Sequence, residues 1–242
     1  TDKVVSVWAR AKNDVWAVGG AQQDLSGSTP HGVVWHYDGS TWTQPPVPNV
    51  DLFRHVYGID SGDVWVIGLR GQILRYHNMT WIPYEGSVGT ALWSVWGAGP
   101  DDVFAVGEGG VIVHWNGAFF SPVTAAAAGT QDLLSIWGSG PKDIWVVGND
   151  APLLHHDGSS WTTPAGALPQ RLASIYGFGA SDIWAVGDNG RILHYDGSAW
   201  SALAIPALIG TNLLAVWGTA SNDLWITCDD GRIFHRSGAS IF

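Results

Sequence analysis

The sequence has few of the residues that cross-link a chain or bind polyanions. Its 242 residues include one cysteine, Cys228, so no disulfide can form within the chain. Lysine and arginine number 11 and aspartate and glutamate number 21, which gives a formal net charge of −10. Nucleic acids and anionic membrane surfaces are bound by basic faces, so we expect neither as a partner.

Charged residues of either sign are also scarce, at 13% of the chain against about 25% in an ordinary domain. The hydrophobic content of 46% nevertheless excludes a disordered chain. The uncharged stretch from Gly197 to Asn222 is interrupted by Pro206 and Gly210, so we expect no membrane insertion. The residues from Thr1 onward lack the basic and apolar regions of a signal peptide, so we expect none in this chain, and a mature exported chain would look the same.

An internal repeat extends over the whole sequence. One aspartate per copy precedes an apolar run, and we call these residues the marker aspartates: Asp14, Asp63, Asp102, Asp143, Asp182 and Asp223. Their spacings of 49, 39, 41, 39 and 41 residues divide the chain into six copies. The first spacing is long because Ala21–His31 stands where the other copies have one residue.

Each copy contains four short strand signals separated by turn residues. In the fifth copy they are Ser174–Gly177, Asp182–Gly187, Arg191–Tyr195 and a run that starts near Trp200. Four strands per copy and a period near 40 residues predict an all-β fold. We expect a single domain over residues 1–242, a six-bladed β-propeller of four-stranded antiparallel blades, with an open β-solenoid as the alternative.

Aromatic residues recur at fixed positions, 16 of them tryptophans in the chain as a whole. The second strand is apolar on both faces, as in a strand that is covered on both sides. We therefore predict that the aromatic residues of the first two strands pack between neighbouring blades. These are Trp8, Tyr57, Trp96, Trp137, Tyr176 and Trp217 on the first strand, and Trp16, Trp65, Phe104, Trp145, Trp184 and Trp225 on the second.

The shared frame SVWGxGxxDVWAVGxxGxIxHxDGxxW is seen best in residues 94–120 and 174–200. It resembles the tryptophan-rich β-propeller repeat of secreted and surface proteins of myxobacteria and related bacteria. The order of strands is also similar to that of kelch blades. Asp38-Gly39-Ser40-Thr41-Trp42 partly resembles the Asp-box of sialidase-type propellers, with one residue fewer between Asp and Gly. The Asp-box is a structural turn, so the resemblance implies a fold and no sialidase activity.

Histidine recurs at one position of the third strand, as His36, His114, His155, His194 and His235. Most copies also have a serine on the first strand, such as Ser94, Ser135 and Ser174. Serine, histidine and the marker aspartate together suggest a hydrolytic triad, but a triad is needed once and this set recurs. We therefore predict a structural network and no catalytic residue. In the second copy the two positions hold His55 and Arg75, as expected if they belong to one network.

The turns after the second strand offer candidate metal ligands. If the first strand is innermost, these turns share one face with the connections that precede the first strands. Oxygen ligands on that face would suit calcium, the one cofactor that the sequence suggests. The alternative is that these residue types simply form tight turns. The candidate ligands are Glu108, Asn149, Asp188 and Asp229.

Features that a single copy adds to the repeat are the better indicators of ligand binding. The insertion Ala21–His31 is polar, and the second copy carries much of the positive charge, including Arg54 and Arg70. Trp35 and Trp93 lie outside the shared aromatic positions. The predicted ligand-binding residues are Gln22, Asp24, His31, Arg70, Glu108, Asp188 and Asp229.

These features favour a non-enzymatic, lectin-like binding module, extracellular or on the cell surface. A glycan or a protein surface is the expected ligand, because the scaffold is rich in tryptophan, poor in charge and bordered by polar turns. Two alternatives remain open. One is a metal-dependent, lactonase-like hydrolase with a cation at the channel mouth, and the other is a protein-interaction scaffold.

Overall fold

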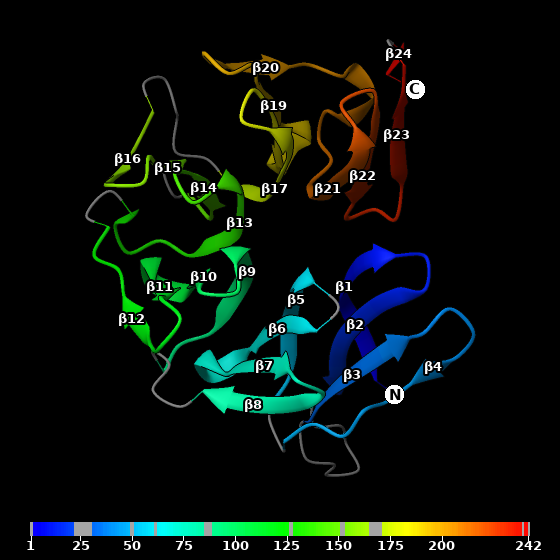
Figure 1. The fold of residues 1–242 in the computed structure, drawn as a ribbon. Helices are drawn as coiled ribbons and strands as arrows, with labels where there is room; N and C mark the ends of the chain where they lie inside the picture. Colours follow the sequence, from blue (N-terminus) through cyan, green and yellow to red (C-terminus); the bar gives the residue numbers. More distant parts are fainter. Residues whose placement is uncertain are drawn as a thin grey trace. The chain divides into compact units, whose positions relative to one another are not determined.

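The computed structural model describes residues 2–21, 31–48, 51–60, 62–84, 89–125, 128–150, 153–164, 171–238 and 240–241. They form six antiparallel four-stranded sheets, which we call blades 1 to 6 (Figure 1). The chain divides into two compact units, unit 1 (Thr1–Val123) and unit 2 (Thr124–Phe242), with three blades each. The predicted blade number and strand number are confirmed, and the assignment of residues 1–242 to one domain stays a prediction.

Unit 1 contains blades 1 to 3, whose strands follow one another in sequence order within each sheet. Blade 1 has β1 (Lys3–Ala11), β2 (Asp14–Ala21), β3 (His31–Tyr37) and β4 (Trp42–Thr43). Blade 2 has β5 (Phe53–Asp60), β6 (Asp63–Gly68), the short 3-10 helix η1 (Leu69–Gly71), β7 (Ile73–His77) and β8 (Thr80–Tyr84). Blade 3 has β9 (Leu92–Gly99), β10 (Asp102–Gly107), η2 (Glu108–Gly110), β11 (Ile112–Trp115) and β12 (Phe120–Pro122).

Unit 2 repeats this arrangement in blades 4 to 6. Blade 4 has β13 (Leu133–Gly140), β14 (Asp143–Gly148), β15 (Leu154–His156) and β16 (Trp161–Thr162). Blade 5 has β17 (Leu172–Gly179), β18 (Asp182–Gly187), η4 (Asp188–Gly190), β19 (Ile192–Tyr195) and β20 (Trp200–Leu203). After η5 (Pro206–Leu208), blade 6 has β21 (Leu213–Ala220), β22 (Asp223–Cys228), β23 (Ile233–Ser237) and β24 (Ser240–Ile241).

The hydrophobic core lies between neighbouring blades of each unit. Trp16 of blade 1 packs against Tyr76 and Trp81 of blade 2, with ring centroids 5.0 and 5.8 Å apart. Trp145 of blade 4 contacts Tyr195 of blade 5 at 5.0 Å in the same way. The two tryptophans are 2% exposed, so a large apolar area is removed from water at these contacts. The predicted packing of aromatic residues between blades is confirmed for these positions.

A glycine of the first strand makes room for the aromatic residue of the preceding blade. A Cβ atom at Gly58 would lie 2.3 Å from the Trp8 ring, and one at Gly177 would lie 2.6 Å from the Trp137 ring. Because both contacts are too short for any side chain, glycine is required there. These copies of the repeat thus keep both the aromatic residue and the glycine that leaves room for it.

The Asp-Gly turns between the third and fourth strands are capped by their own aspartates. The Asp38 carboxylate accepts hydrogen bonds from the backbone N–H groups of Ser40 and Thr41, both at 2.8 Å. These bonds hold the pKa of Asp38 well below its usual range. Asp196 is capped by Ala199 and Ser198 in the same way, which lowers its pKa to about 2. This geometry assigns the turns a structural role.

Candidate functional site

Each marker aspartate is hydrogen-bonded to the third strand of its own blade. The aspartate and the aromatic residue two positions later share one face of the second strand, and the histidine lies opposite that aromatic residue, as in the pairing of Trp184 with His194. The Nε2 atom of the histidine therefore reaches the carboxylate. The pairs are Asp14–His36 (3.0 Å), Asp102–His114 (2.6 Å), Asp143–His155 (2.8 Å), Asp182–His194 (2.9 Å) and Asp223–His235 (2.6 Å).

An aromatic ring covers each of these histidines. The rings of Trp184 and His194 are stacked with centroids 4.1 Å apart, and the Trp184 Nε1–H donates to Asp182 at 2.9 Å. Burial alone would raise the pKa of Asp14, but hydrogen bonds from His36 and Arg10 hold it below its usual value. The Asp14 carboxylate is thus held ionised by its own blade.

The serines of the first strand belong to a different set of contacts. The Ser6 Oγ atom accepts the backbone N–H of Val56 in the next blade at 3.2 Å. Ser135 and Ser174 accept from Ile175 and Val216 at the same distance, again in the next blade. In these blades the serine hydroxyl joins neighbouring sheets, and the histidine bonds to the marker aspartate. The predicted structural role is therefore supported, whereas the grouping of both residue types into one network is not.

Blade 2 has different residues at both positions, an arginine in place of the histidine and a histidine in place of the serine. Arg75 donates from Nε and Nη2 to the two oxygens of Asp63, at 2.7 and 2.5 Å, and from Nη2 to the Pro100 carbonyl of blade 3 at 3.1 Å. His55 takes the serine position, and its Nδ1 accepts the Val95 N–H at 3.3 Å. Burial lowers the pKa of His55 to about 4, so the ring is neutral at pH 7. Arg75 and His55 therefore bind different partners.

The turns after the second strands lie beside the segments that precede the first strands, as predicted. In each case the residue after the strand-ending Gly or Cys donates its N–H to the carbonyl of the residue just before the first strand. The bonds are Leu69–Leu52 (3.1 Å), Glu108–Ala91 (2.9 Å), Asn149–Asp132 (2.8 Å), Asp188–Arg171 (3.2 Å) and Asp229–Asn212 (3.0 Å). We call this repeated contact the turn clasp.

The predicted metal ligands close the turn clasp with their side chains. Asp188 forms an ion pair with Arg171 at 2.6 Å, and Asp229 accepts from the Asn212 side chain at 2.8 Å. Glu108 accepts the Ala91 N–H at 3.4 Å. Among the described residues, no three His, Cys, Asp or Glu side chains form a group that could hold a metal ion. Calcium binding by Glu108, Asn149, Asp188 and Asp229 thus stays a prediction, and the turn clasp accounts for three of the four side chains.

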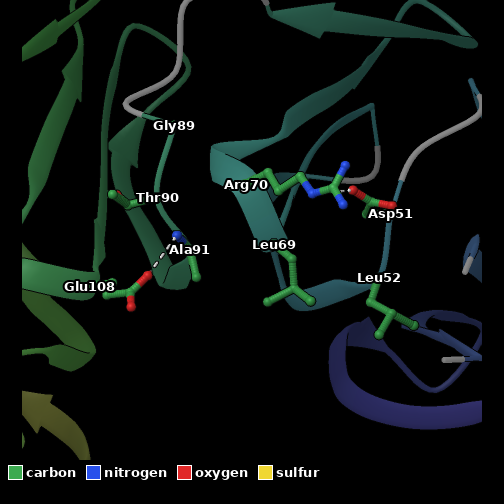
Figure 2. A pocket seen from close by; sticks show the side chains of 8 residues that line it. All are labelled: Asp51, Leu52, Leu69, Arg70, Gly89, Thr90, Ala91 and Glu108. Carbon is green, nitrogen blue, oxygen red and sulfur yellow. Dashed lines mark hydrogen bonds and ion pairs between the residues drawn. The ribbon is translucent and has the colours of Figure 1, made fainter.

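A hollow of about 420 Å³ lies between the turn clasps of blades 2 and 3 in unit 1 (Figure 2). Its lining residues are Asp51, Leu52, Leu69, Arg70, Gly89, Thr90, Ala91 and Glu108. The structure therefore brings together Arg70 and Glu108, two of the predicted ligand-binding residues. The Arg70 side chain is 80% exposed and forms an ion pair with Asp51 at 3.1 Å.

The other predicted ligand-binding residues lie elsewhere or outside the described chain. His31 pairs with Asp2 at 3.0 Å. Gln22 and Asp24, with the rest of the insertion between Ala21 and His31, lie outside the described residues. In unit 2, Asn149 and Asp188 line a second hollow of about 540 Å³, together with Arg171 and Arg191.

Two features of blades 2 and 3 were not predicted from the sequence. The Thr90 hydroxyl is buried and has no hydrogen-bond partner among the described residues. The Arg54 guanidinium of β5 lies over the Trp93 ring of β9, 5.0 Å from its centroid. The sequence distinguishes Arg54 and Trp93 because neither residue fits the repeat. Only the placement of blades 2 and 3 shows that the two side chains are in contact.

Comparisons with known proteins identify the fold and no family. No protein-family model matches the chain, and no curated protein does. Three solved structures are similar over nearly the whole chain. YCF48 bound to D1 peptide has a TM-score of 0.71 at 16% identity, with 98% of this chain and 77% of that chain covered. YCF48 from Cyanidioschyzon merolae has a TM-score of 0.63 at 14% identity, with 98% and 95% covered.

The third is the WD40 beta propeller domain of Doa1, with a TM-score of 0.62 at 10% identity and 96% and 92% of the two chains covered. The chain is thus an all-β protein, a β-propeller of six four-stranded blades. At these identities the likeness concerns the fold alone. The resemblance to the tryptophan-rich bacterial repeat, to kelch blades and to the Asp-box stays a sequence resemblance. No helix in the described residues is long and apolar enough to span a membrane.

Proposed function

We propose that the chain is a non-enzymatic module that binds a peptide or a segment of a protein partner in the hollow between blades 2 and 3. A single observation carries the proposal. Arg70 and Thr90, which both line this hollow, are each less favourable for stability than another residue would be at the same position. Locally unfavourable residues that meet in one hollow are typical of a binding site.

Arg70 occupies a backbone conformation that suits glycine. Its φ angle is +59°, in the left-handed region, where a side chain costs roughly 1 kcal/mol. The same turn position holds Gly109 in blade 3, and Asp150 and Asn189 in blades 4 and 5, with φ angles between +52° and +69°. Glycine, asparagine and aspartate tolerate this backbone region best, whereas an arginine there is strained. The side chain that it projects is also largely exposed.

Thr90 carries a hydroxyl that forms no hydrogen bond within the part of the chain that the structure describes. An unpaired buried hydroxyl costs about 1–3 kcal/mol, and valine has the same shape without that cost. Rotation about χ1 of Thr90 would turn the hydroxyl toward a ligand, since threonine populates more than one rotamer. The residue is therefore better suited to recognition than to packing.

The other lining residues supply the mixed chemistry that a peptide requires. Leu52, Leu69 and Ala91 provide apolar surface, while Glu108 and Arg70 provide an acceptor and a donor. A peptide backbone offers N–H groups to Glu108 and C=O groups to Arg70, and its side chains can cover the apolar surface. The similarity in fold to YCF48, whose structure was solved with a bound D1 peptide, supports this choice of ligand class.

Glycan binding, the lectin-like function favoured by the composition, has less support from the geometry. Sugars stack on open tryptophan faces, and Arg54 lies over a face of the Trp93 ring. Hydrolysis is not favoured either, because Ser6, Ser135 and Ser174 bond to the next blade and the recurring histidines bond to the marker aspartates. A location outside the cell remains part of the proposal and rests on the sequence resemblance.

Selection from a random peptide library tests the proposal directly. We expect panning against the full chain to select peptides whose affinity falls at least tenfold in Arg70→Gly and in Thr90→Val. Both variants should keep a melting temperature equal to or above that of the unmodified chain. Asp150→Gly is the matched control, because it relieves the same φ angle in blade 4 without changing the hollow.

A glycan array run in parallel separates the alternatives. Recovery of glycans without peptides would replace the proposal by carbohydrate binding. Selected peptides that bind both hollow variants with unchanged affinity would show that the ligand binds elsewhere on the chain.

A further inference from the structure

Arg54 and Trp93 form a pair on the first strands of two neighbouring blades. Arg54 is the second residue of β5, Trp93 is the second residue of β9, and both are half-buried. The guanidinium carbon lies 5.0 Å from the centre of the indole ring. The corresponding position is apolar in the other four blades, where it holds Val5, Leu134, Ala173 and Leu214. The repeat therefore does not need a cation or an indole here.

Two hydrogen-bond donors of this pair are unpaired. The Arg54 Nε and Trp93 Nε1 atoms are both buried, and neither has a hydrogen-bond partner in the described structure. Buried donors without acceptors are uncommon because such a donor loses its hydrogen bond to water and gains none in return. Two such donors on side chains in contact mark a position at which the described chain supplies no hydrogen-bond acceptor.

The other arginine–tryptophan stacks in the described chain do not leave donors unpaired on both side chains. Arg75 lies over Trp65 at 4.8 Å, and the Trp65 Nε1 atom is unpaired, but the Arg75 Nε atom donates to Asp63. Arg236 lies over Trp184 of unit 2, also 5.0 Å from a ring centroid. This stack has an unpaired Arg236 Nε atom, but the Trp184 Nε1–H is bonded to Asp182 at 2.9 Å, so the indole has its acceptor. At Trp93 the corresponding acceptor does not exist within the described chain.

Arg54 also differs from the other arginines of blade 2. Arg70 is paired with Asp51 and Arg75 with Asp63, whereas no carboxylate pairs with Arg54 among the described residues. A guanidinium and an indole N–H are both donors only, and their shared complement is an oxygen acceptor with negative charge. A carboxylate offers two such oxygens.

We propose that Arg54 and Trp93 together bind a carboxylate of the peptide that occupies the hollow, which makes this inference dependent on the proposed function. Leu52 and Ala91 line the hollow and lie two residues before Arg54 and Trp93 in the chain, each just before the start of the strand. Two residues of β-strand span about 6–7 Å, so one peptide can contact both places. The arginine swings off the ring on binding. A half-buried cation–π contact is weaker than the charge-assisted hydrogen bonds that replace it.

The indole N–H resonances of the full chain, recorded by 15N-resolved NMR, report on the proposed site. Trp93→Phe identifies the Trp93 signal, and sodium acetate is the first probe, with sodium chloride at equal ionic strength as its control. We expect acetate to shift the Trp93 signal with saturation and to leave the Trp184 signal unmoved. Arg54→Leu should abolish the shift, and Arg236→Leu should preserve it. A Trp93 signal that responds equally to chloride, or to neither salt, would overturn the proposal.

The selected peptides provide the second arm and identify the source of the carboxylate. Each peptide is compared with a form amidated at its C-terminus and with a form in which Asp and Glu are replaced by Asn and Gln. We expect one of the two changes, and Arg54→Leu, to weaken binding roughly tenfold or more. If Arg70→Gly weakens binding but Arg54→Leu and both peptide changes do not, the carboxylate assignment is wrong and the proposed function stands. If no peptide binds, the proposed function itself fails.

Discussion

Blades 2 and 5 have the same strands and the same marker aspartate, yet they stabilise it in different ways. In blade 5, Asp182 is about a quarter exposed and bonds to a histidine and to the indole of Trp184. In blade 2, Asp63 is almost fully buried and bonds to both arms of Arg75. Blade 5 thus holds its aspartate with partly exposed imidazole and indole groups, whereas blade 2 buries an arginine–aspartate ion pair.

The difference has a consequence for the rest of each blade. Arg75 takes both oxygens of Asp63, so the Trp65 Nε1 atom is left buried without a partner, while Trp184 keeps its bond to the aspartate. In exchange, Arg75 reaches the Pro100 carbonyl and stacks over Trp65 at 4.8 Å. Blade 2 is therefore tied to blade 3 by a charged residue that the histidine cannot replace.

The largest effect that separates the two blades is expected from removing the aspartate. Asp63→Ala leaves a buried guanidinium without its counter-charge, which costs about 3–5 kcal/mol. Asp182→Ala leaves a partly exposed histidine that water can solvate, so we expect a loss of about 1–2 kcal/mol. Urea unfolding of the full chain measures both. Equal losses would show that burial of the ion pair does not set the stability of blade 2.

A smaller effect is expected when blade 2 is converted to the common pattern. Arg75→His keeps a partner for Asp63 but is too short to reach Pro100, so we expect a loss of about 1–3 kcal/mol. The Trp65 indole should then gain the hydrogen bond that Trp184 has, which is measurable as a shift of its N–H signal. An unchanged or increased unfolding free energy would contradict the importance of the Pro100 contact.

In blade 5 the corresponding truncation is His194→Ala. It removes the bond to Asp182 and the stacking on Trp184, and we expect a loss of about 1–2 kcal/mol in the free energy of unfolding. Peptide affinity of the folded variant should not change, because His194 is committed to its own blade. A loss of binding without a loss of stability would reassign the recurring histidines to function.

The repeated parts of this molecule were predicted well from the sequence, because the same residue pattern recurs in each copy. Six marker aspartates defined six four-stranded blades, and the histidine at a fixed distance defined its bond to the aspartate. The serine contacts were assigned to the wrong partner, since Ser6 bonds to a residue 50 positions away in the next blade. Periodicity within one copy contains no information about which atom of the next copy comes closest.

The candidate site was predicted only in part for the same reason. Arg70 and Glu108 were expected on one face, and the structure places both at one hollow. Asp188 and Asp229 were expected to be free for ligands, but the turn clasp uses their carboxylates. The Arg54–Trp93 stack and the unpaired Thr90 hydroxyl depend on how two blades meet, which no single repeat shows.

The smallest effect at neutral pH, and the one most specific to blade 2, is expected from His55→Ser. Ser6 and Ser174 show that a serine Oγ can accept the N–H of the next blade at this position, so stability at pH 7 should change by less than about 1 kcal/mol. The pH dependence should change more. The pKa of His55 is about 4 in the folded chain and about 6.5 when the chain is unfolded, so the unfolded state binds the extra proton between these values.

The stability linked to His55 is therefore complete above pH 6.5 and falls as the pH drops toward 4. Unfolding free energies at pH 7, 6 and 5 should fall in the unmodified chain and fall less steeply in His55→Ser. The aspartates of the capped turns do not mask this difference, because their lowered pKa values place their titration below about pH 4. Parallel pH profiles for the two chains would show that the His55 ring is solvated in the folded state and that its contact with Val95 does not depend on the neutral form.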